Sequence, residues 1–337
     1  MIKYKSILVT GGTGSFGKAF IKYLVNKEKN IKRLVIFSRD EWKQSELMKD
    51  YPKKKYPFIR FFIGDVRDRE RLNRSFRNID LVVHAAALKQ VPAAEYNPTE
   101  FINTNIIGAQ NVIESAINQK VKKVIALSTD KAAAPINLYG ATKLCSDKLF
   151  ISANNYAGSE KISFSVCRYG NVMGSRGSVI PFFLDNAKSG KLLITDKNMT
   201  RFNITLEESI KFVIFAINNS IGREIFVPKI PSYRLIDLAK SIGPSCKFEI
   251  VGVRPGEKIH EEMITEADSV NSFEAKNYYI IFPSMDKKKE RIIEKQFKAK
   301  KITKEFSYKS DSNKFFLSVP KIRELIKKNL DKNFKPF

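Results

Sequence analysis

Short apolar runs alternate with segments of helical periodicity through the first half of the chain. Between the runs, apolar positions recur at three- and four-residue spacing, as at 15–29 and 100–119, which is typical of amphipathic helices. The runs have the length and the apolar character of buried strands; they cover 6–10, 33–37, 59–63, 81–84, 123–128 and 162–167. This order of strands and helices predicts an α/β fold built on a doubly wound parallel sheet.

The rhythm changes after Asn171, where Gly and Pro become frequent. A helix is expected over 206–218, because Thr205 can cap its first turn and acidic residues follow directly. A final helix is expected after Ser318, with Pro320 near its first position. No internal repeat or flexible linker is evident, so the second half is expected to pack against the first.

Composition narrows the class of protein. No run among the 337 residues approaches the roughly 20 apolar residues that a membrane span needs. The N-terminal sequence leads straight into a strand, so we expect no signal peptide and a cytoplasmic protein. The cysteines Cys145, Cys167 and Cys246 are widely spaced, and His84 and His260 stand alone, so neither a disulfide framework nor a metal site is expected.

The chain is strongly basic, with 60 Lys and Arg against 35 Asp and Glu, a formal charge of +25. Such a charge can indicate a nucleic acid or an anionic membrane as partner. The lysines are spread along the chain, however, and no basic motif is interleaved with aromatic residues. We therefore expect a solvated basic surface and neither partner, with the Lys runs at 53–55 and 287–289 in loops or on helix faces.

A glycine-rich turn follows the first predicted strand. Gly11, Gly14 and Gly17 form G-x-x-G-x-x-G between that strand and the first helix. Glycines here allow a tight turn and a close backbone approach to a pyrophosphate at a helix N-terminus. A simple strand-to-helix turn is the alternative, but the position in the first βαβ unit favours a Rossmann-type dinucleotide site. The turn also contributes Thr13, Ser15 and Phe16.

The end of the second strand bears on the choice of dinucleotide. An acid is expected there for NAD, whereas Ser38 and Arg39 suit the 2′-phosphate of NADP. Asp40 and Glu41 follow directly, so NAD stays open as the less favoured cofactor. Residues after later strands complete the predicted site. Asp65 and Val66 follow the third strand, where an adenine ring is usually bracketed, and the small side chains of Ala85, Ala86 and Ala87 let the protein backbone approach the cofactor. We also assign to it Lys43, Lys89, Thr104 and Val172.

Candidate chemistry lies between Ser128 and Lys143. Tyr139 and Lys143 form Y-x-x-x-K, so they lie one helical turn apart on one face. A nearby ammonium and a positively charged nicotinamide would favour the phenolate, which can accept a proton from a hydroxyl as hydride leaves. An ordinary amphipathic helix would show the same spacing by chance, but the glycine-rich turn makes the catalytic interpretation stronger.

These motifs together resemble the extended short-chain dehydrogenase/reductase superfamily over nearly the whole chain. They are G-x-x-G-x-x-G, Y-x-x-x-K, N-I-I-G-A-Q-N (105–111) and R-Y-G-N-V (168–172). Within it, the chain is most similar to the inverting UDP-N-acetylglucosamine 4,6-dehydratases of pseudaminic acid biosynthesis, a pathway associated with flagellin glycosylation. That similarity rests on 128–150, 86–92, 199–202 and R-P-G-E-K-I-H-E-E-M (254–263). Ala134 departs from the family pattern, in which we expect Asn, and this bears on local geometry rather than on function.

The resemblance implies a set of catalytic roles. Oxidation at C4 of the sugar acidifies C5–H, so the reaction needs a hydride acceptor, two bases and an acid. NADP+, Tyr139 for the 4-hydroxyl, Lys131 for C5–H and Asp130 for the leaving 6-hydroxyl would fill these roles. Thr129 would hydrogen-bond the 4-oxygen, and Lys143 would hold the nicotinamide ribose and tune Tyr139.

The adjacent Asp130 and Lys131 separate related reactions. Dehydratases that retain configuration at C5 typically carry Asp-Glu there, so Lys131 implies proton return to the opposite face. Lys131 must be neutral to act as a base, so its pKa is expected to fall through burial or the cofactor's charge. An exposed ion pair in a turn is the structural alternative. A C5-retaining dehydratase, a 4-epimerase of a UDP-sugar, and a non-enzymatic nucleotide-sensing or nucleic-acid-binding protein remain the competing functions.

The expected substrate, UDP-N-acetylglucosamine, carries a pyrophosphate and a uracil. By resemblance the segment 176–181 lines the nucleotide, and Arg201 and Arg254 suit phosphate oxygens through their forked donors. Glu257 could accept a hydrogen bond from a ribose hydroxyl. The full set of predicted substrate ligands is Lys89, Asn171, Ser178, Val179, Thr195, Arg201, Arg254 and Glu257.

These assignments suggest how the chain is divided. We expect an NADP-binding Rossmann domain over 1–172 and a mainly substrate-binding lobe over 173–337. A segment of about 200–228 is expected to return to the first domain. A homo-oligomer, dimer or hexamer, is expected by resemblance.

Overall fold

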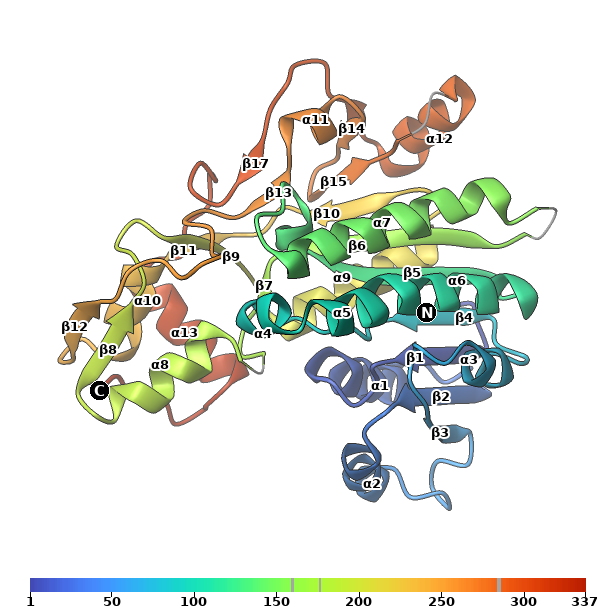
Figure 1. Cartoon of the computed structure of the whole chain (residues 1–337), viewed down its shortest axis with the longest axis horizontal. Coiled ribbons are helices and arrows are strands. Elements are labelled where there is room, and N and C mark those ends of the chain that lie inside the picture. Colours follow the sequence, from blue (N-terminus) through green and yellow to red (C-terminus); the bar gives the residue numbers. More distant parts are fainter. Residues whose placement is uncertain (159–160, 176, 284–285) are drawn as a thin grey trace.

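A large twisted sheet forms the centre of the molecule (Figure 1). The computed structural model describes the whole chain except residues 159–160, 176 and 284–285. Within that part the sheet has ten strands in the order β16-β14-β15-β10-β6-β5-β4-β1-β2-β3. Its parallel portion consists of β1 (Ser6–Thr10), β2 (Arg33–Ser38), β3 (Ile59–Ile63), β4 (Leu81–His84), β5 (Lys123–Thr129), β6 (Ser163–Tyr169) and β10 (Ile225–Pro228). Three strands extend it in antiparallel register: β15 (Tyr278–Ile281), β14 (Ser272–Glu274) and β16 (Lys300–Lys301).

Helices cover both faces of the parallel strands, which confirms the doubly wound Rossmann-type fold. α3, α6 and α7 pack side by side over one face, and α1 packs beside α9 over the other. The strands between them are mainly apolar, and Leu8, Val35 and Val82 are completely buried. The helices on this sheet are α1 (Ser15–Lys27), α2 (Glu41–Asp50), α3 (Arg69–Ser75), α4 (Val91–Tyr96), α5 (Pro98–Phe101), α6 (Gly108–Asn118), α7 (Leu138–Tyr156) and α9 (Leu206–Asn219).

The helix expected over 100–119 is divided in the structure. Between α5 and α6 the chain forms a π-helical turn, η1 (Ile102–Ile107). Its Asn105 accepts a hydrogen bond from the Leu88 amide and donates to the Leu88 carbonyl, both at 2.9 Å, and it also donates to Thr142 at 3.0 Å. The wider turn therefore ties α7 to the loop after β4, at the edge where the sites below are built.

A smaller lobe with its own apolar core lies at one end of the molecule (Figure 1). Phe183, Leu192, Leu238 and Ile326 are almost completely buried in that core. The elements of this lobe are α8 (Val179–Ala187), β8 (Lys191–Ile194), α10 (Leu235–Ile242), β12 (Lys247–Ile250) and α13 (Val319–Asn329), with β8 and β12 paired in parallel. The role of the lobe in substrate binding stays a prediction.

The chain after residue 172 contributes to both cores. Phe273, Ile280 and Phe297 belong to the same apolar cluster as the large sheet, so the return to it extends well past 228. The elements that carry this return are β10, β13 (Glu262–Ile264), α11 (Glu266–Ser269), β14, β15, α12 (Lys287–Phe297), β16 and β17 (Tyr308–Lys309). The division of the chain at residue 172 remains a prediction.

A small sheet lies where the two cores meet. It has the order β11-β9-β7, formed by β7 (Asn171–Val172), β9 (Thr200–Ile204) and β11 (Ser232–Arg234). β7 follows β6 after one residue and pairs in parallel with β9, while β11 pairs with β9 in antiparallel register. This arrangement carries Asn171 and Arg201 to the carboxyl end of the large sheet.

Two local predictions from the sequence are confirmed. Thr205 caps α9 in a reciprocal capping box with Glu208. Ser318 is the N-cap of α13, with Pro320 in its first turn. The N-termini of α9 and α13 are set by residues that are neighbours in the chain, which is why the sequence identifies them.

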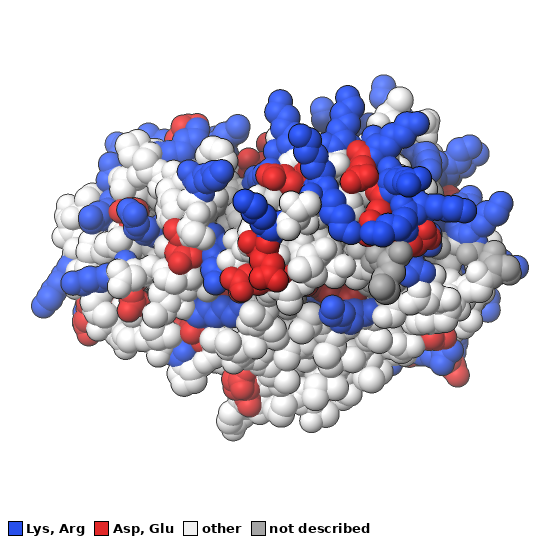
Figure 2. Space-filling view, turned by 90° about the horizontal axis from the view of Figure 1, so that it is seen from above, with Lys and Arg blue, Asp and Glu red and all other residues white. Residues whose placement is uncertain are grey.

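The basic residues lie mainly on the surface (Figure 2). The Lys run at 53–55 is an exposed turn between α2 and β3, and the run at 287–289 begins α12, as expected. Figure 2 shows Lys and Arg crowded over the face that carries α12. Across the described ranges, none of the helices has both the length and the apolarity required to cross a bilayer.

The departure at Ala134 has a physical consequence. Its φ is +42°, in the left-handed region where an alanine Cβ is strained and asparagine is better tolerated. The Ala134 side chain is exposed, so a larger one has room. We predict that Ala134→Asn raises the free energy of unfolding by about 1 kcal/mol, measured by chemical denaturation.

Ala267→Asn is the matched control, because Ala267 is exposed in α11 and does not have a positive φ. It should give no gain, since asparagine is a poorer helix former than alanine. A stability of Ala134→Asn equal to or below that of the parent chain would contradict the prediction.

Candidate active site

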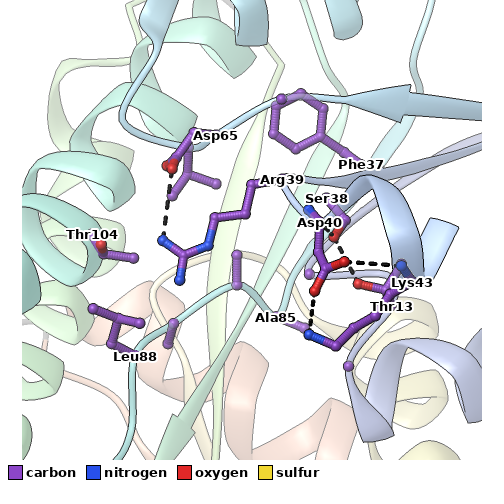
Figure 3. Close-up of a pocket in the computed structure, with 16 residues that line it drawn as sticks. Thr13, Phe37, Ser38, Arg39, Asp40, Lys43, Asp65, Ala85, Leu88 and Thr104 are labelled. Atoms are coloured by element: carbon purple, nitrogen blue, oxygen red, sulfur yellow. Dashed lines mark hydrogen bonds and ion pairs between the residues drawn. The ribbon is translucent and has the colours of Figure 1, made fainter. Parts of the chain in front are cut away.

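The first candidate site is a pocket at the carboxyl ends of β1, β2, β3 and β4 (Figure 3). Gly11 has a φ of +66°, and a Cβ there would lie 2.8 Å from the Ala86 nitrogen. A Cβ on Gly17 would lie 2.6 Å from the Gly11 oxygen. Glycine is therefore required at both positions, because the turn packs closely against the loop after β4 and against α1. The lining includes the predicted residues Gly11, Thr13, Gly14, Ser38, Arg39, Asp40, Lys43, Asp65, Val66, Ala85, Ala86, Ala87 and Thr104.

The N-terminus of α1 opens onto this pocket. Gly14 is its N-cap, and no side chain caps its first amides. Free helix-terminal amides beside a glycine turn suit a phosphate group. Ser15, Phe16 and Gly17 lie in the first turn of α1 and are not part of the pocket lining.

Polar side chains at the end of β2 form one wall (Figure 3). The Thr13 and Ser38 hydroxyls share a hydrogen bond of 2.7 Å. Asp40 caps α2 by accepting from the Lys43 amide at 2.9 Å and is paired with the Lys43 ammonium. Arg39 is 53% exposed and extends across the pocket toward Asp65, with 3.8 Å between its Nη1 and Oδ2 of Asp65.

Further residues fit a bound dinucleotide. The Thr104 hydroxyl is buried and has no hydrogen-bond partner among the described residues, which a ligand group could supply. The sequence interpretation missed Phe37, Gly64 and Leu88, which also line the pocket. A Cβ on Gly64 would lie 2.5 Å from the Phe37 ring. The signal that could have identified this contact is a glycine directly after the third strand.

A second, polar cluster begins where β5 ends. Thr129 is the last residue of β5, and Asp130 and Lys131 form a 3-10 turn, η2 (Asp130–Ala132). The Thr129 hydroxyl donates to Asp130 Oδ1 at 2.9 Å. Asp130 is completely buried, and its Oδ2 has no partner within the described part of the chain. Burial raises the pKa of Asp130 and the Glu261 charge adds to this, although the Lys131 charge opposes it. A raised pKa suits a carboxylic acid that donates a proton.

Lys131 is held by three partners from separate segments. Its Nζ lies 3.1 Å from Asp130 Oδ1, 2.9 Å from Glu261 Oε1 and 3.3 Å from Asn171 Oδ1. The alternative of an exposed ion pair in a turn does not fit, because the Lys131 side chain is 21% exposed and both carboxylates are buried.

The sequence predicted a lowered pKa for Lys131, and this prediction is wrong when only the protein's own groups act on it. Burial by itself lowers the pKa of the ammonium, as the sequence suggested. The negative charges of Asp130 and Glu261 outweigh burial, so the pKa of Lys131 is raised. The sequence did not reveal Glu261 as the second carboxylate.

Tyr139 and Lys143 lie on the first turns of α7, which is capped by Asn137. Burial raises the pKa of Tyr139 to about 12, and the Lys131 charge and a hydrogen bond with Thr129 only partly offset it. The Lys143 ammonium donates to the Leu127 carbonyl at 2.8 Å, and burial lowers its pKa. The protein groups alone therefore keep Tyr139 protonated, in contrast to the phenolate expected from Lys143 and a charged nicotinamide.

Residues 256–261 pass over this cluster; we call them the crossing segment. Asn137 donates to the Gly256 carbonyl at 2.7 Å, and Lys258 donates to the Ala133 carbonyl at 2.7 Å. The Ile259 carbonyl accepts from Arg201 at 3.0 Å. These contacts place the crossing segment between the start of α7 and β9, and they explain how Glu261 reaches Lys131.

The predicted substrate residues fall into two groups. Asn171 and Arg201 belong to the polar cluster, and burial together with the Lys131 charge lowers the pKa of nearby Lys89. Arg201 is 8% exposed and also donates to the Thr200 carbonyl, so its guanidinium faces inward. Val172 is the second residue of β7, beside Asn171.

The other group lies around the smaller lobe and the crossing segment. Ser178 and Val179 begin α8, and Thr195 directly follows β8. Arg254 is exposed, and its carbonyl accepts from the Glu257 amide at 3.0 Å. The buried Oε2 of Glu257 lacks a partner among the described residues. Arg176 of the predicted 176–181 segment lies outside the described residues.

Together, the glycine-rich turn, the Rossmann-type sheet and the Thr129–Tyr139–Lys143 cluster define an extended short-chain dehydrogenase/reductase. A family model described as "Polysaccharide biosynthesis protein" matches residues 7–283. The chain belongs to this family.

Several relatives are similar over most of the chain. A UDP-N-acetylglucosamine 4,6-dehydratase (inverting) of Campylobacter jejuni subsp. jejuni serotype O:2 is 51% identical over 332 residues, covering 97% of this chain and 98% of the relative. A UDP-glucose 4-epimerase of Rickettsia akari is 43% identical over 284 residues, 82% of each chain. The X-ray structure of Pen from Bacillus thuringiensis is 39% identical with a TM-score of 0.87, covering 97% of this chain and 98% of that one.

Proposed function

We propose that the protein is a C5-inverting 4,6-dehydratase that converts UDP-N-acetylglucosamine to UDP-2-acetamido-2,6-dideoxy-L-arabino-hexos-4-ulose. The observation that carries the proposal is the pair of the buried Asp130 with the largely buried Lys131, beside Tyr139. The identity of 51% with the inverting dehydratase of C. jejuni supports it. We further propose that this reaction opens pseudaminic acid biosynthesis in the cytoplasm and that the enzyme is a homo-oligomer.

The residues of the polar cluster divide the chemistry among them. The residues of the pocket would hold NADP+, which would supply the hydride chemistry at C4 and C6. Tyr139, as the phenolate that a bound and positively charged nicotinamide would favour, takes the proton of the 4-hydroxyl, and the resulting 4-ketone acidifies C5–H. Lys131, as the neutral amine, takes that proton, while Asp130 protonates the 6-hydroxyl so that it leaves as water. A proton then returns to the opposite face of C5.

We propose NADP as the cofactor, with NAD less favoured. Asp40 would be the acid that favours NAD, but its carboxylate is engaged in capping α2 and in the pair with Lys43. Ser38, Arg39 and Lys43 all line the pocket, where they could hold a 2′-phosphate. The residues that would hold the rest of the cofactor are the glycine turn, Asp65, Val66, Thr104, Tyr139 and Lys143.

A second candidate function is a C5-retaining 4,6-dehydratase or a UDP-sugar 4-epimerase. The 43% identity with the epimerase of R. akari favours considering it. Incubation with UDP-N-acetylglucosamine in heavy water, followed by NMR, separates the three reactions. An epimerase gives no 6-deoxy methyl signal, whereas either dehydratase gives one, and the C5 configuration then distinguishes inversion from retention.

The role of Lys131 can be tested by Lys131→Ala. We predict loss of C5 deuterium incorporation and of dehydration, by about a hundredfold or more, with NADP affinity unchanged. NMR of the product and a fluorescence titration with NADP give the two measurements. Lys148→Ala, exposed on the same helix as Tyr139, should keep full activity. Turnover that persists in Lys131→Ala would exclude the proposed mechanism.

The cofactor assignment can be tested by Arg39→Ala. Loss of a charge-assisted contact to a 2′-phosphate should weaken NADP binding by about tenfold to a hundredfold and leave NAD binding nearly unchanged. Titration calorimetry with each dinucleotide measures the difference. Lys49→Ala, exposed on α2 outside the pocket, should alter neither affinity. Equal losses for both dinucleotides would show that Arg39 does not read the 2′-phosphate.

A further inference from the structure

Glu261 is a buried carboxylate that the proposed reaction leaves without a role. It lies immediately before β13, is 2% exposed, and places Oε1 2.9 Å from Lys131 Nζ. Its backbone is fixed on both sides by Ser310, whose hydroxyl accepts from the Glu261 amide at 2.9 Å and whose amide donates to the Glu261 carbonyl at 2.8 Å. The carboxylate is therefore held in place by contacts separate from those it makes with Lys131.

The two carboxylates beside Lys131 have different surroundings. Glu261 Oε1 also lies 3.7 Å from Arg201 Nε, so this carboxylate faces two cations. Asp130 is completely buried and shares one oxygen between Thr129 and Lys131, while the other oxygen is unpartnered among the described residues. A carboxylate near two cations is more readily ionised than one in a buried site with a single shared cation.

We propose that Glu261 is a positioning residue that serves as the permanent counter-ion of Lys131 and leaves Asp130 free to carry the proton for the departing hydroxyl. This inference rests on the function proposed above. The carboxyl groups of Glu261 and Asp130 would then have separate tasks because their environments differ.

The proton balance is consistent with this division. At the elimination step the neutral Lys131 amine gains the C5 proton and becomes an ammonium, and the protonated Asp130 loses its proton to the C6 oxygen, which departs as water. C5 later takes a proton from solvent on its opposite face, the Lys131 ammonium releases its proton, and solvent restores the proton of Asp130. Glu261 keeps its negative charge throughout, so it stabilises the ammonium formed when C5–H is broken.

The effect on pH dependence follows from the charges that face Lys131. The charged and titratable side chains that face it, from every element packed around it, are those of Asp130, Tyr139, Lys89, Arg201, Tyr233, Lys258 and Glu261. Replacing Glu261 by glutamine removes one negative charge and lowers the pKa of both Lys131 and Asp130. Activity requires neutral Lys131 together with protonated Asp130, so a lower pKa for each group moves both limbs of the pH profile to lower pH.

The test compares Glu261→Gln with the wild-type chain. We expect both limbs of the pH profile of kcat/KM for UDP-N-acetylglucosamine to shift downward by about one to three pH units, with the maximal rate reduced at least about tenfold. Glu261→Asp keeps the charge, so its limbs should stay in place while its maximal rate falls. Glu262→Gln is the matched control, because Glu262 pairs in register with Lys309 and the Lys309 charge acts on its carboxylate. Limbs that do not move in Glu261→Gln overturn the proposal.

A direct measurement keeps the inference separate from the proposed function. The ¹³Cε resonance of Lys131, assigned by its absence in Lys131→Met, can be titrated in protein without substrate. In the wild-type chain it should titrate above the ordinary lysine value of 10.5, and in Glu261→Gln about one to three units lower. Titration of the wild-type residue below 10.5 overturns the proposal even if Glu261→Gln does not fold. A wild-type chain that forms no 6-deoxy product but shows these titrations would refute the proposed function and leave the ion pair established.

Discussion

The buried ion pair between Lys131 and Glu261 is the constraint on which the architecture of the candidate site depends. Its two residues lie 130 positions apart, and each is fixed by its own segment: η2 at the end of β5, and the crossing segment before β13. A buried charge that loses its partner costs several kcal/mol, about 3–5 in measured cases. The crossing segment must therefore lie over the carboxyl end of β5 for the polar cluster to be stable. That placement also brings Arg201 and the start of α7 to the same point.

The parallel sheet explains why this cluster lies next to the cofactor pocket. Strand order changes direction between β1 and β4, and the loops on the carboxyl side separate there to leave a crevice. The glycine turn after β1 occupies one side of the crevice, and the cluster after β5 lies on the other. Asn105 connects the loop after β4 with α7, because it hydrogen-bonds Leu88 of that loop and the Thr142 hydroxyl of α7.

The sequence predicted those parts of the molecule that are encoded by neighbouring residues. The strands, the capping of α9 by Thr205, the glycine turn and the Asp130-Lys131-Tyr139 sequence all follow from short patterns. Glu261 was missed although R-P-G-E-K-I-H-E-E-M was recognised, since no periodicity says which acid of that motif turns toward Lys131. The pKa direction of Lys131 failed for the same reason: it depends on a balance between burial and charges brought in by β9 and the crossing segment. The return of β14, β15 and β16 to the large sheet likewise depends on tertiary pairing, which short strands do not specify.

Three buried carboxylate oxygens without hydrogen-bond partners connect the stability of the site with its function. Asp130 Oδ2, Glu257 Oε2 and Glu261 Oε2 are each buried with no hydrogen-bond partner among the residues that the structure describes. Each such group costs about 1–3 kcal/mol, so a fold selected for stability alone would replace or satisfy it. All three lie on η2 or on the crossing segment, and the Lys131 ammonium lies beside the carboxylates of Asp130 and Glu261. Their grouping is what a site built for a polar ligand requires, because donors on that ligand would satisfy oxygens that the protein leaves open.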